Sequence, residues 1–204
     1  GMTATSHVAA SDIVAVLVKS GLAPQESLIL PGRAARYKPI PNGLHQKLVE
    51  QLNQWYPAGL YSHQSDTIQA LCDGRDVCLA TPTASGKSLV FMTIAAEITM
   101  RDRFARVLAV YPAKALIQDQ LAKWNDFMDP FGIRVGFIDG SVAVSERSAI
   151  LSSCRVIAMT PDVLHAWLMS RLATKEVAEF LRHLRLFILD EAHVYDGAFG
   201  TNMA

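Results

Sequence analysis

Apolar residues follow two different spacings along this 204-residue chain. From Leu60 onward, short runs rich in Val, Ile, Leu and Phe alternate with stretches whose apolar residues recur at helical intervals. The short runs show little polar alternation, which predicts strands buried on both faces of a sheet. They lie at residues 76–80, 106–111, 134–138, 155–159 and 186–189. Strands separated by helices indicate βαβ units, so the expected fold class is α/β with a mostly parallel sheet.

The stretches between these runs predict helices at residues 88–100, 113–128 and 161–169 and near 177–184. In the second helix, one apolar face is formed by Ile117, Leu121, Trp124 and Met128. Their spacing of three and four residues is that of a helix packed on a core. Thr160 followed by Pro161 is typical of an N-cap and a first helical position.

The first 59 residues have a different pattern. Ser11 and Asp12 are suited to cap a short helix that runs to Val18, and the proline- and glycine-rich residues 31–43 predict an extended loop. A further helix is predicted by the apolar face of Leu44, Leu48, Leu52 and Trp55, ended by Pro57 and Gly59. We therefore interpret residues 1–59 as a helical accessory segment that precedes a domain at 60–204.

Composition narrows the class of protein. Half of the residues are hydrophobic and 19% are charged, which excludes an intrinsically disordered chain. The net charge of zero neither favours nor excludes nucleic acid, because a local basic groove can exist in a neutral protein. Cys72, Cys78 and Cys154 lack metal-binding spacing and are predicted to be buried free thiols. No run approaches the ~18 apolar residues of a membrane span, so we expect a cytoplasmic protein with no membrane contact.

Residues 81–88 carry the strongest chemical signal. Their sequence, Thr-Pro-Thr-Ala-Ser-Gly-Lys-Ser, fits the spacing of a P-loop, with Thr81 where the general pattern has glycine. The segment follows a predicted strand and opens a predicted helix, a geometry that directs backbone N–H groups at a polyphosphate. The residues expected to surround the phosphates are Thr83, Ala84, Ser85, Gly86, Lys87 and Ser88. Lys87 would reach the β- and γ-phosphates of ATP and Ser88 would ligate Mg²⁺; the alternative is an ordinary strand–loop–helix turn.

A second signal ends the last predicted strand. Asp190 and Glu191 follow an apolar run, at the carboxyl end of a sheet where ligands of open α/β folds bind. Asp190 would hold Mg²⁺ through its water shell, and Glu191 would polarise the attacking water. Two solvated acids at the end of a buried strand are the alternative. The order of this pair after a P-loop favours a nucleoside triphosphatase.

These motifs together resemble a known family. Gly86-Lys87-Ser88 and Asp190-Glu191-Ala192-His193 are similar to motifs I and II of superfamily 2 DEAD/DEAH-box-type helicases. Residues 61–64 (Tyr-Ser-His-Gln) resemble the adenine-reading Q motif, 111–116 resemble motif Ia, and 160–162 resemble motif Ib. The combination is most similar to the YprA-like and Hrq-like DNA helicases, a branch linked to DNA repair. The resemblance implies the first RecA-like lobe of such a helicase, a three-layer P-loop fold.

The resemblance also implies roles for residues outside the P-loop. Gln64 would pair with adenine, while Pro112, Lys114 and Thr160 would hold single-stranded DNA by its phosphates. Structural alternatives stay open, because Pro112 also suits the end of a strand and Thr160 a helix N-cap. His193 is either a link to a neighbouring lobe or a structural group.

Motifs beyond the second are absent from this sequence, so we expect a fragment truncated after motif II. A second RecA-like lobe would supply an arginine worth ~10³–10⁵ in rate, and the isolated chain should therefore be nearly inactive. Three functions stay open. They are a helicase lobe, a lobe of a double-stranded DNA translocase, and a non-hydrolytic interaction module that keeps the fold; RNA also stays open as the substrate.

Overall fold

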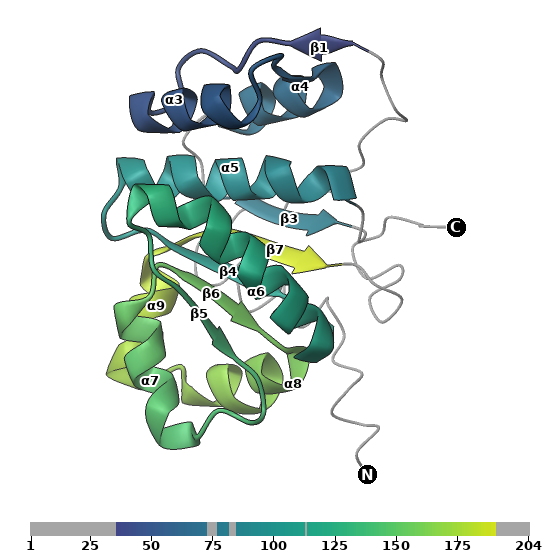
Figure 1. The fold of residues 1–204 in the computed structure, drawn as a ribbon. Helices are drawn as coiled ribbons and strands as arrows, with labels where there is room; N and C mark the ends of the chain where they lie inside the picture. The colour runs from purple at the N-terminus through teal and green to yellow at the C-terminus, as the bar shows by residue number, and fades with distance from the viewer. Residues whose placement is uncertain (1–35, 73–76, 82–84, 113, 191–204) are drawn as a thin grey trace.

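The computed structural model describes residues 36–72, 77–81, 85–112 and 114–190, and for 77–81 and 85–86 it describes the backbone. A five-stranded parallel sheet forms the centre (Figure 1). Its strands are β3 (Val77–Thr81), β4 (Arg106–Val110), β5 (Val135–Ile138), β6 (Val156–Met159) and β7 (Leu184–Asp190). They lie in the order β3-β7-β4-β6-β5. The predicted α/β fold and all five predicted strands are confirmed.

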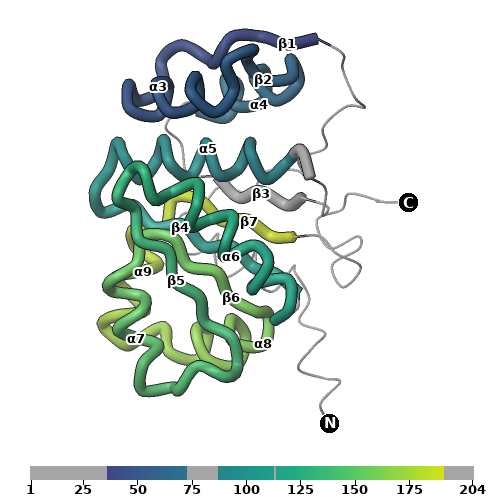
Figure 2. The backbone as a smooth tube through the Cα atoms, viewed as in Figure 1, coloured from purple at the N-terminus to yellow at the C-terminus, as the bar shows by residue number. Residues whose placement is uncertain are grey.

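Helices cover both faces of this sheet (Figure 1). The helices of one face are α5 (Ser85–Arg101) and α6 (Lys114–Met128). The helices of the other face are α7 (Val144–Ser153), α8 (Pro161–Val163) and α9 (Lys175–Arg182). Two more helices, α3 (Gln46–Trp55) and α4 (Ser62–Leu71), pack on the outside of α5 (Figures 1 and 2). The chain therefore has the three layers of a RecA-like lobe, with a further helical layer over α5.

Each face of the sheet has its own apolar core. Val107 and Ala109 of β4 lie in the cluster under α5 and α6, whereas Leu108 and Val110 lie in the cluster under α7, α8 and α9. This alternation follows from the period of two residues in a strand, and it explains why the run is apolar throughout. Trp124 of α6 is fully buried in the first cluster. Burial of each large apolar side chain contributes about 1.5–3 kcal/mol before entropy is counted.

The described part of the N-terminal segment shares the first of these cores. Leu44, Leu48 and Leu52 are buried in the same cluster as the α5 residues, while Trp55 is 38% exposed at the edge of the predicted face. Polar contacts add to this packing. Glu97 of α5 accepts a hydrogen bond from the His45 backbone N–H at 2.5 Å, at the point where α3 begins.

A short antiparallel ribbon joins the segment to the domain. Strand β1 (Tyr37–Lys38) pairs with β2 (Leu60–Tyr61), directly before α4. Gly59 precedes β2 with φ of +91°, and a Cβ there would lie 2.1 Å from the Lys38 carbonyl oxygen. Glycine is required at this position because both the backbone angle and the close approach exclude a side chain.

Three parts of the fold differ from the sequence prediction or lie beyond it. The helix expected at 161–169 is divided into α8, a π-helical turn at Leu164–Leu168 (η2) and a 3₁₀ turn at Met169–Arg171 (η3). The sequence pattern did not predict α4 and α7. The helix expected from Ser11 to Val18 lies outside the described residues.

Candidate nucleotide and nucleic-acid site

The P-loop segment connects β3 to α5 as predicted. Strand β3 ends at Thr81 and α5 begins at Ser85, while Thr83 and Ala84 lie outside the described residues. Lys87, in the first turn of α5, is 8% exposed. A lysine ammonium and the positive end of a helix dipole reinforce each other, so their juxtaposition favours an anion at this end of α5.

Asp190 lies next to this segment although it is distant in sequence. It is the last residue of β7 and is directly opposite Thr81 of β3 in the parallel register. Its side chain is 5% exposed. Neighbouring strands lie about 4.8 Å apart, so the fold brings the two predicted halves of a nucleotide site together. Glu191 and His193 lie outside the described residues.

At the carboxyl ends of four adjacent strands, one side chain from each strand end or the residue directly after it faces α5 and α6. Residues two and four positions earlier in each strand pack in the cluster under those helices, and side chains alternate along a strand. Across the sheet the four are Asp190, Tyr111, Thr160 and Asp139, which we call the carboxyl-end row. With a strand spacing of about 4.8 Å, the row extends about 14 Å from Asp190 to Asp139. It leads from the P-loop to the ends of β6 and β5.

Tyr111 occupies the second place in the carboxyl-end row and is buried. Its hydroxyl accepts a hydrogen bond from the Trp124 indole N–H at 2.9 Å. Burial raises the pKa of Tyr111 above its usual range and the charge of Asp190 raises it further, against the opposing effect of the Trp124 hydrogen bond. The phenol is therefore neutral at physiological pH.

Thr160 and Asp139 end the row on the side away from the P-loop. The hydroxyl of Thr160 and the Oδ2 atom of Asp139 are buried without a hydrogen-bond partner in the described residues. Thr160 occupies the N-cap position of α8 as predicted, but its side chain forms no capping hydrogen bond. Buried polar atoms are normally satisfied, so this end of the row has unused capacity for hydrogen bonding.

Asp139 is nevertheless a stabilised carboxylate. Its Oδ1 accepts hydrogen bonds from the Ser141 backbone N–H at 2.8 Å and from the Ser141 hydroxyl. Burial raises the pKa of Asp139, but these bonds and the charge of Lys114 outweigh burial and hold it below its ordinary value. Lys114 is exposed at the start of α6, and Pro112 is half-buried just before it. The predicted nucleic-acid residues thus lie around one end of the row, with Lys114 accessible and Thr160 covered.

Gln64 lies in α4, outside the sheet. Its side chain is buried, and Oε1 accepts a hydrogen bond from the Tyr61 backbone N–H at 3.1 Å. Beside Gln64 the rings of Tyr37, Tyr61 and His63 form a stack, with centroid distances of 5.1 and 5.8 Å. Sequence reasoning missed Tyr37, because only the pairing of β1 with β2 brings it here.

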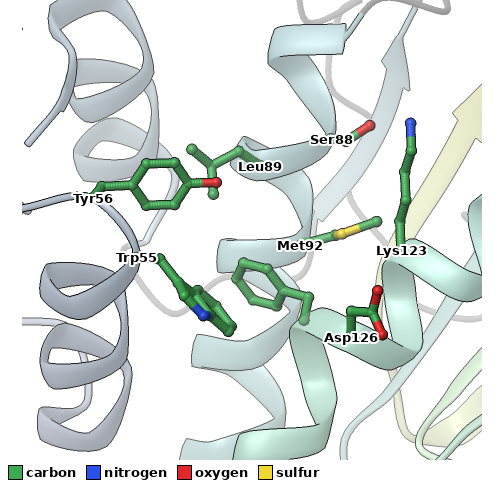
Figure 3. Close-up of a pocket in the computed structure, with 8 residues that line it drawn as sticks. Trp55, Tyr56, Ser88, Leu89, Met92, Lys123 and Asp126 are labelled. Atoms are coloured by element: carbon green, nitrogen blue, oxygen red, sulfur yellow. The ribbon is translucent and has the colours of Figure 1, made fainter.

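Ser88 lines an open pocket of about 580 Å³ between α3, α5 and α6 (Figure 3). Trp55 and Tyr56 form one wall, and Lys123 and Asp126 of α6 lie opposite them. The remaining lining is apolar and comprises Leu89, Met92 and Phe127. Of the described residues in the predicted nucleotide site, Ser88 lines this pocket, whereas Lys87 and Asp190 do not.

The donors available for a metal are oxygen atoms. Ser88 supplies a hydroxyl and Asp190 a carboxylate, which suits Mg²⁺ because that ion takes few protein ligands and completes its shell with phosphates and water. Among the described residues, no group of three or more His, Cys, Asp or Glu side chains could hold a metal by itself.

Cys154 is a buried free thiol as predicted, and Cys72 is a partly buried one. No helix in the described ranges is long and apolar enough to span a bilayer.

Comparison with known proteins agrees with this geometry. The profile of the DEAD/DEAH box helicase family matches residues 61–204. The chain is 33% identical over 180 residues to the ATP-dependent helicase HRQ1 of Saccharomyces cerevisiae, covering 86% of this chain and 16% of that protein. It is 30% identical over 174 residues to YprA of Bacillus subtilis, named an uncharacterized ATP-dependent helicase, covering 84% of this chain and 23% of that protein.

A solved structure extends the match to three dimensions. The DUF1998 helicase MrfA, crystallised with DNA and AMPPNP, aligns with a TM-score of 0.70 and 25% identity over 93% of this chain and 27% of that chain. The chain thus spans about a quarter or less of the length of these relatives. The predicted resemblance to the YprA-like and Hrq-like branch is confirmed, and relatives of the chain are named ATP-dependent helicases.

Proposed function

This chain belongs to the DEAD/DEAH box helicase family, and we propose that it is the ATP-binding lobe of an ATP-dependent helicase that acts on single-stranded DNA. The observation that supports this most directly is the register of β3 with β7, which sets Asp190 opposite the last residue before the P-loop. In this arrangement residues 60–204 are the lobe, and residues 1–59 are an accessory segment whose described part, from residue 36, packs on α5.

The phosphates of ATP would lie at the N-terminus of α5. There the backbone N–H groups of residues 83–88 and the Lys87 ammonium would face the negative charge of the phosphates. Mg²⁺, when bound, neutralises part of that charge, and Ser88 and Asp190 are the residues that would hold it. Glu191 would orient the attacking water, as a general base does in phosphoryl transfer. The burial of Lys87 and Asp190 supports this assignment, because charges act more strongly where water is excluded.

The adenine ring would bind at the start of α4. The Gln64 amide at the start of α4 carries a donor, Nε2, and an acceptor, Oε1, which is the pair of groups that the edge of adenine requires. The neighbouring stack of Tyr37, Tyr61 and His63 offers flat apolar surface of the kind on which a base stacks.

A DNA strand would cross the other end of the carboxyl-end row. Lys114 is the accessible cation there, and the unused Thr160 hydroxyl becomes a phosphate donor once the residues covering it move. Such contacts hold the backbone of a strand without reading its sequence. The DNA-bound state of MrfA supports DNA as the partner. A second lobe would close on the nucleotide and supply an arginine, so this chain alone should hydrolyse ATP very slowly.

The test is calorimetric titration of Mg-ADP into the 204-residue chain and into Lys87→Ala. We expect measurable binding that the substitution abolishes. Lys123→Ala is the matched control, because this lysine is exposed in the adjoining pocket and should leave the affinity unchanged. Equal affinities of the wild type and Lys87→Ala would refute the nucleotide site. Fluorescence anisotropy with matched DNA and RNA oligonucleotides then tests the substrate, and a clear preference for RNA would overturn DNA as the partner.

A further inference from the structure

Tyr111 lies between the two functional ends of the carboxyl-end row. It directly follows β4, which is flanked by β7, which carries Asp190, and by β6, which leads to Thr160. The Tyr111 backbone N–H donates to the Met159 carbonyl at 3.1 Å, so the register with β6 continues through this residue. The next residue is Pro112, where the loop to α6 begins. A displacement of the Tyr111 backbone would therefore also displace Pro112, which follows it directly in the chain.

The side chain of Tyr111 is tied to α6 as well. Trp124, in the middle of that helix, donates its indole N–H to the Tyr111 hydroxyl at 2.9 Å, and both side chains are at least 98% buried. An indole has one hydrogen-bond donor and no acceptor, so the bond to Tyr111 uses the whole hydrogen-bonding capacity of the Trp124 side chain. Since α6 begins at Lys114, the bond fixes the helix that carries the accessible cation.

The side chains of Tyr111 and Asp190 are neighbours in the carboxyl-end row. Both side chains face α5 and α6 from neighbouring strands, since Val110 is paired with Leu189 and the strands are parallel. The pKa of Tyr111 is raised by burial first and also by the Asp190 charge, so the carboxylate is near enough to act on the phenol. A protonated phenol can accept from Trp124 while its own O–H dipole turns toward a neighbouring charge.

We propose that Tyr111 and Trp124 form a positioning relay that transmits the charge state around Asp190 to α6 and to the loop beginning at Pro112. A change in that charge reorients the Tyr111 hydroxyl, alters its strength as an acceptor for Trp124, and so shifts α6 relative to the sheet. Tyr111 is a positioning residue, since it acts through Trp124. The proposal rests on the proposed function only for the statement that nucleotide and Mg²⁺ change the charge at Asp190.

The relay is tested by NMR on the 204-residue chain without nucleotide. The chain has three tryptophans, so its indole N–H region has three signals, and Trp124→Phe identifies one of them. Four samples are compared: wild type, Asp190→Asn, Tyr111→Phe, and the double variant. Trp167 is the internal reference, because it is buried in the core on the opposite face of the sheet.

In the wild-type background, Asp190→Asn should shift the Trp124 indole signal and leave that of Trp167 in place. In the Tyr111→Phe background the same substitution should shift it much less, because the hydroxyl that carries the effect is absent. An equal shift in both backgrounds would overturn the relay, since the effect would then bypass the hydroxyl. A merely structural Tyr111 would not produce this non-additivity.

If Tyr111→Phe fails to give a dispersed spectrum, wild type and Asp190→Asn still decide the question. A Trp124 signal that does not move between these two samples overturns the relay, and a selective shift supports it. None of these samples contains nucleotide. Failure of the relay and failure of ATP binding are therefore separate outcomes, the first seen here and the second in the Mg-ADP titration.

Discussion

Leu52 offers a measure of how firmly the N-terminal helices belong to the lobe. The residue lies in α3, is completely buried and packs in the same cluster as the apolar residues of α5. Leu52→Ala removes buried apolar atoms and leaves a cavity, which costs about 2–5 kcal/mol for a leucine. We expect about 3 kcal/mol, because the outer layer can partly collapse onto α5. For a domain of this size, that lowers the melting temperature by about 6–12 °C.

The assay is urea unfolding followed by far-UV circular dichroism and tryptophan fluorescence. Leu172→Ala is the matched control, because it removes the same atoms from a side chain that is 44% exposed. The control should change the free energy of unfolding by no more than about 0.5 kcal/mol. We expect both variants to unfold in one transition with an unchanged slope, Leu52→Ala at the lower urea concentration.

Two results would refute this reasoning. A midpoint equal to that of the wild type would mean that the Leu52 side chain does not stabilise the native lobe. An early minor transition followed by an unchanged main one would mean that α3 unfolds by itself. In either case residues 36–59 would be an appendage of the lobe instead of part of its core.

Three further predictions concern the carboxyl-end row and Lys114 beside it. The pKa of Tyr111 is raised in the folded chain, so the contribution of its protonated phenol to the free energy of unfolding is complete below about pH 10 and is lost as the pH rises further. Tyr111→Phe should therefore reduce the fall of the urea midpoint above that pH. The lowered pKa of Asp139 acts in the opposite direction: its contribution is present above about pH 4 and is lost on acidification, and Asp139→Asn should remove that loss from acid-unfolding curves. Lys114→Ala should weaken binding of single-stranded DNA and reduce the salt slope measured by fluorescence anisotropy by about 1, and an unchanged slope would exclude a phosphate contact.

The sheet could be predicted from sequence because its signal is redundant. Strands buried on both faces are continuous apolar runs, as in β4 and β6, and no polar residue interrupts them. The same is true of the P-loop and Asp190, since both are fixed by short motifs at the ends of such strands. In α6 the apolar face was also clear, and Ile117, Trp124 and Met128 are buried as predicted.

Helices α4 and α7 were missed because polar residues share their buried faces with apolar ones. Gln64 and Ser65 are buried in α4, and Arg147 is buried in α7, where Val144 is more than half exposed. Arg147 lies against the Trp167 ring, 5.6 Å from its centroid, a long-range contact that no local pattern contains. Periodicity detects only burial that follows hydrophobicity.

The Thr160 hydroxyl shows a different limit of sequence reasoning. Thr-Pro predicted the N-cap position correctly, because that preference depends on local backbone geometry. Whether the hydroxyl forms the capping bond depends on what surrounds it in the folded chain, and here it forms none. Local motifs therefore locate the candidate site, whereas the state of its hydrogen bonds is a tertiary property.

The strand order has a consequence for how the lobe is made. The strand that enters the P-loop, β3, pairs with β7, the last strand of the described chain, and β7 also pairs with β4. During synthesis, β3 therefore emerges from the ribosome long before its partner, and the place between β3 and β4 is the last of the five-stranded sheet to be filled. Thr81 and Asp190 become neighbours only in that final insertion. Nascent chains that have not yet incorporated β7 would hence lack the register between the two halves of the proposed nucleotide site, so a ligand of that site would stabilise the lobe only after β7 has paired.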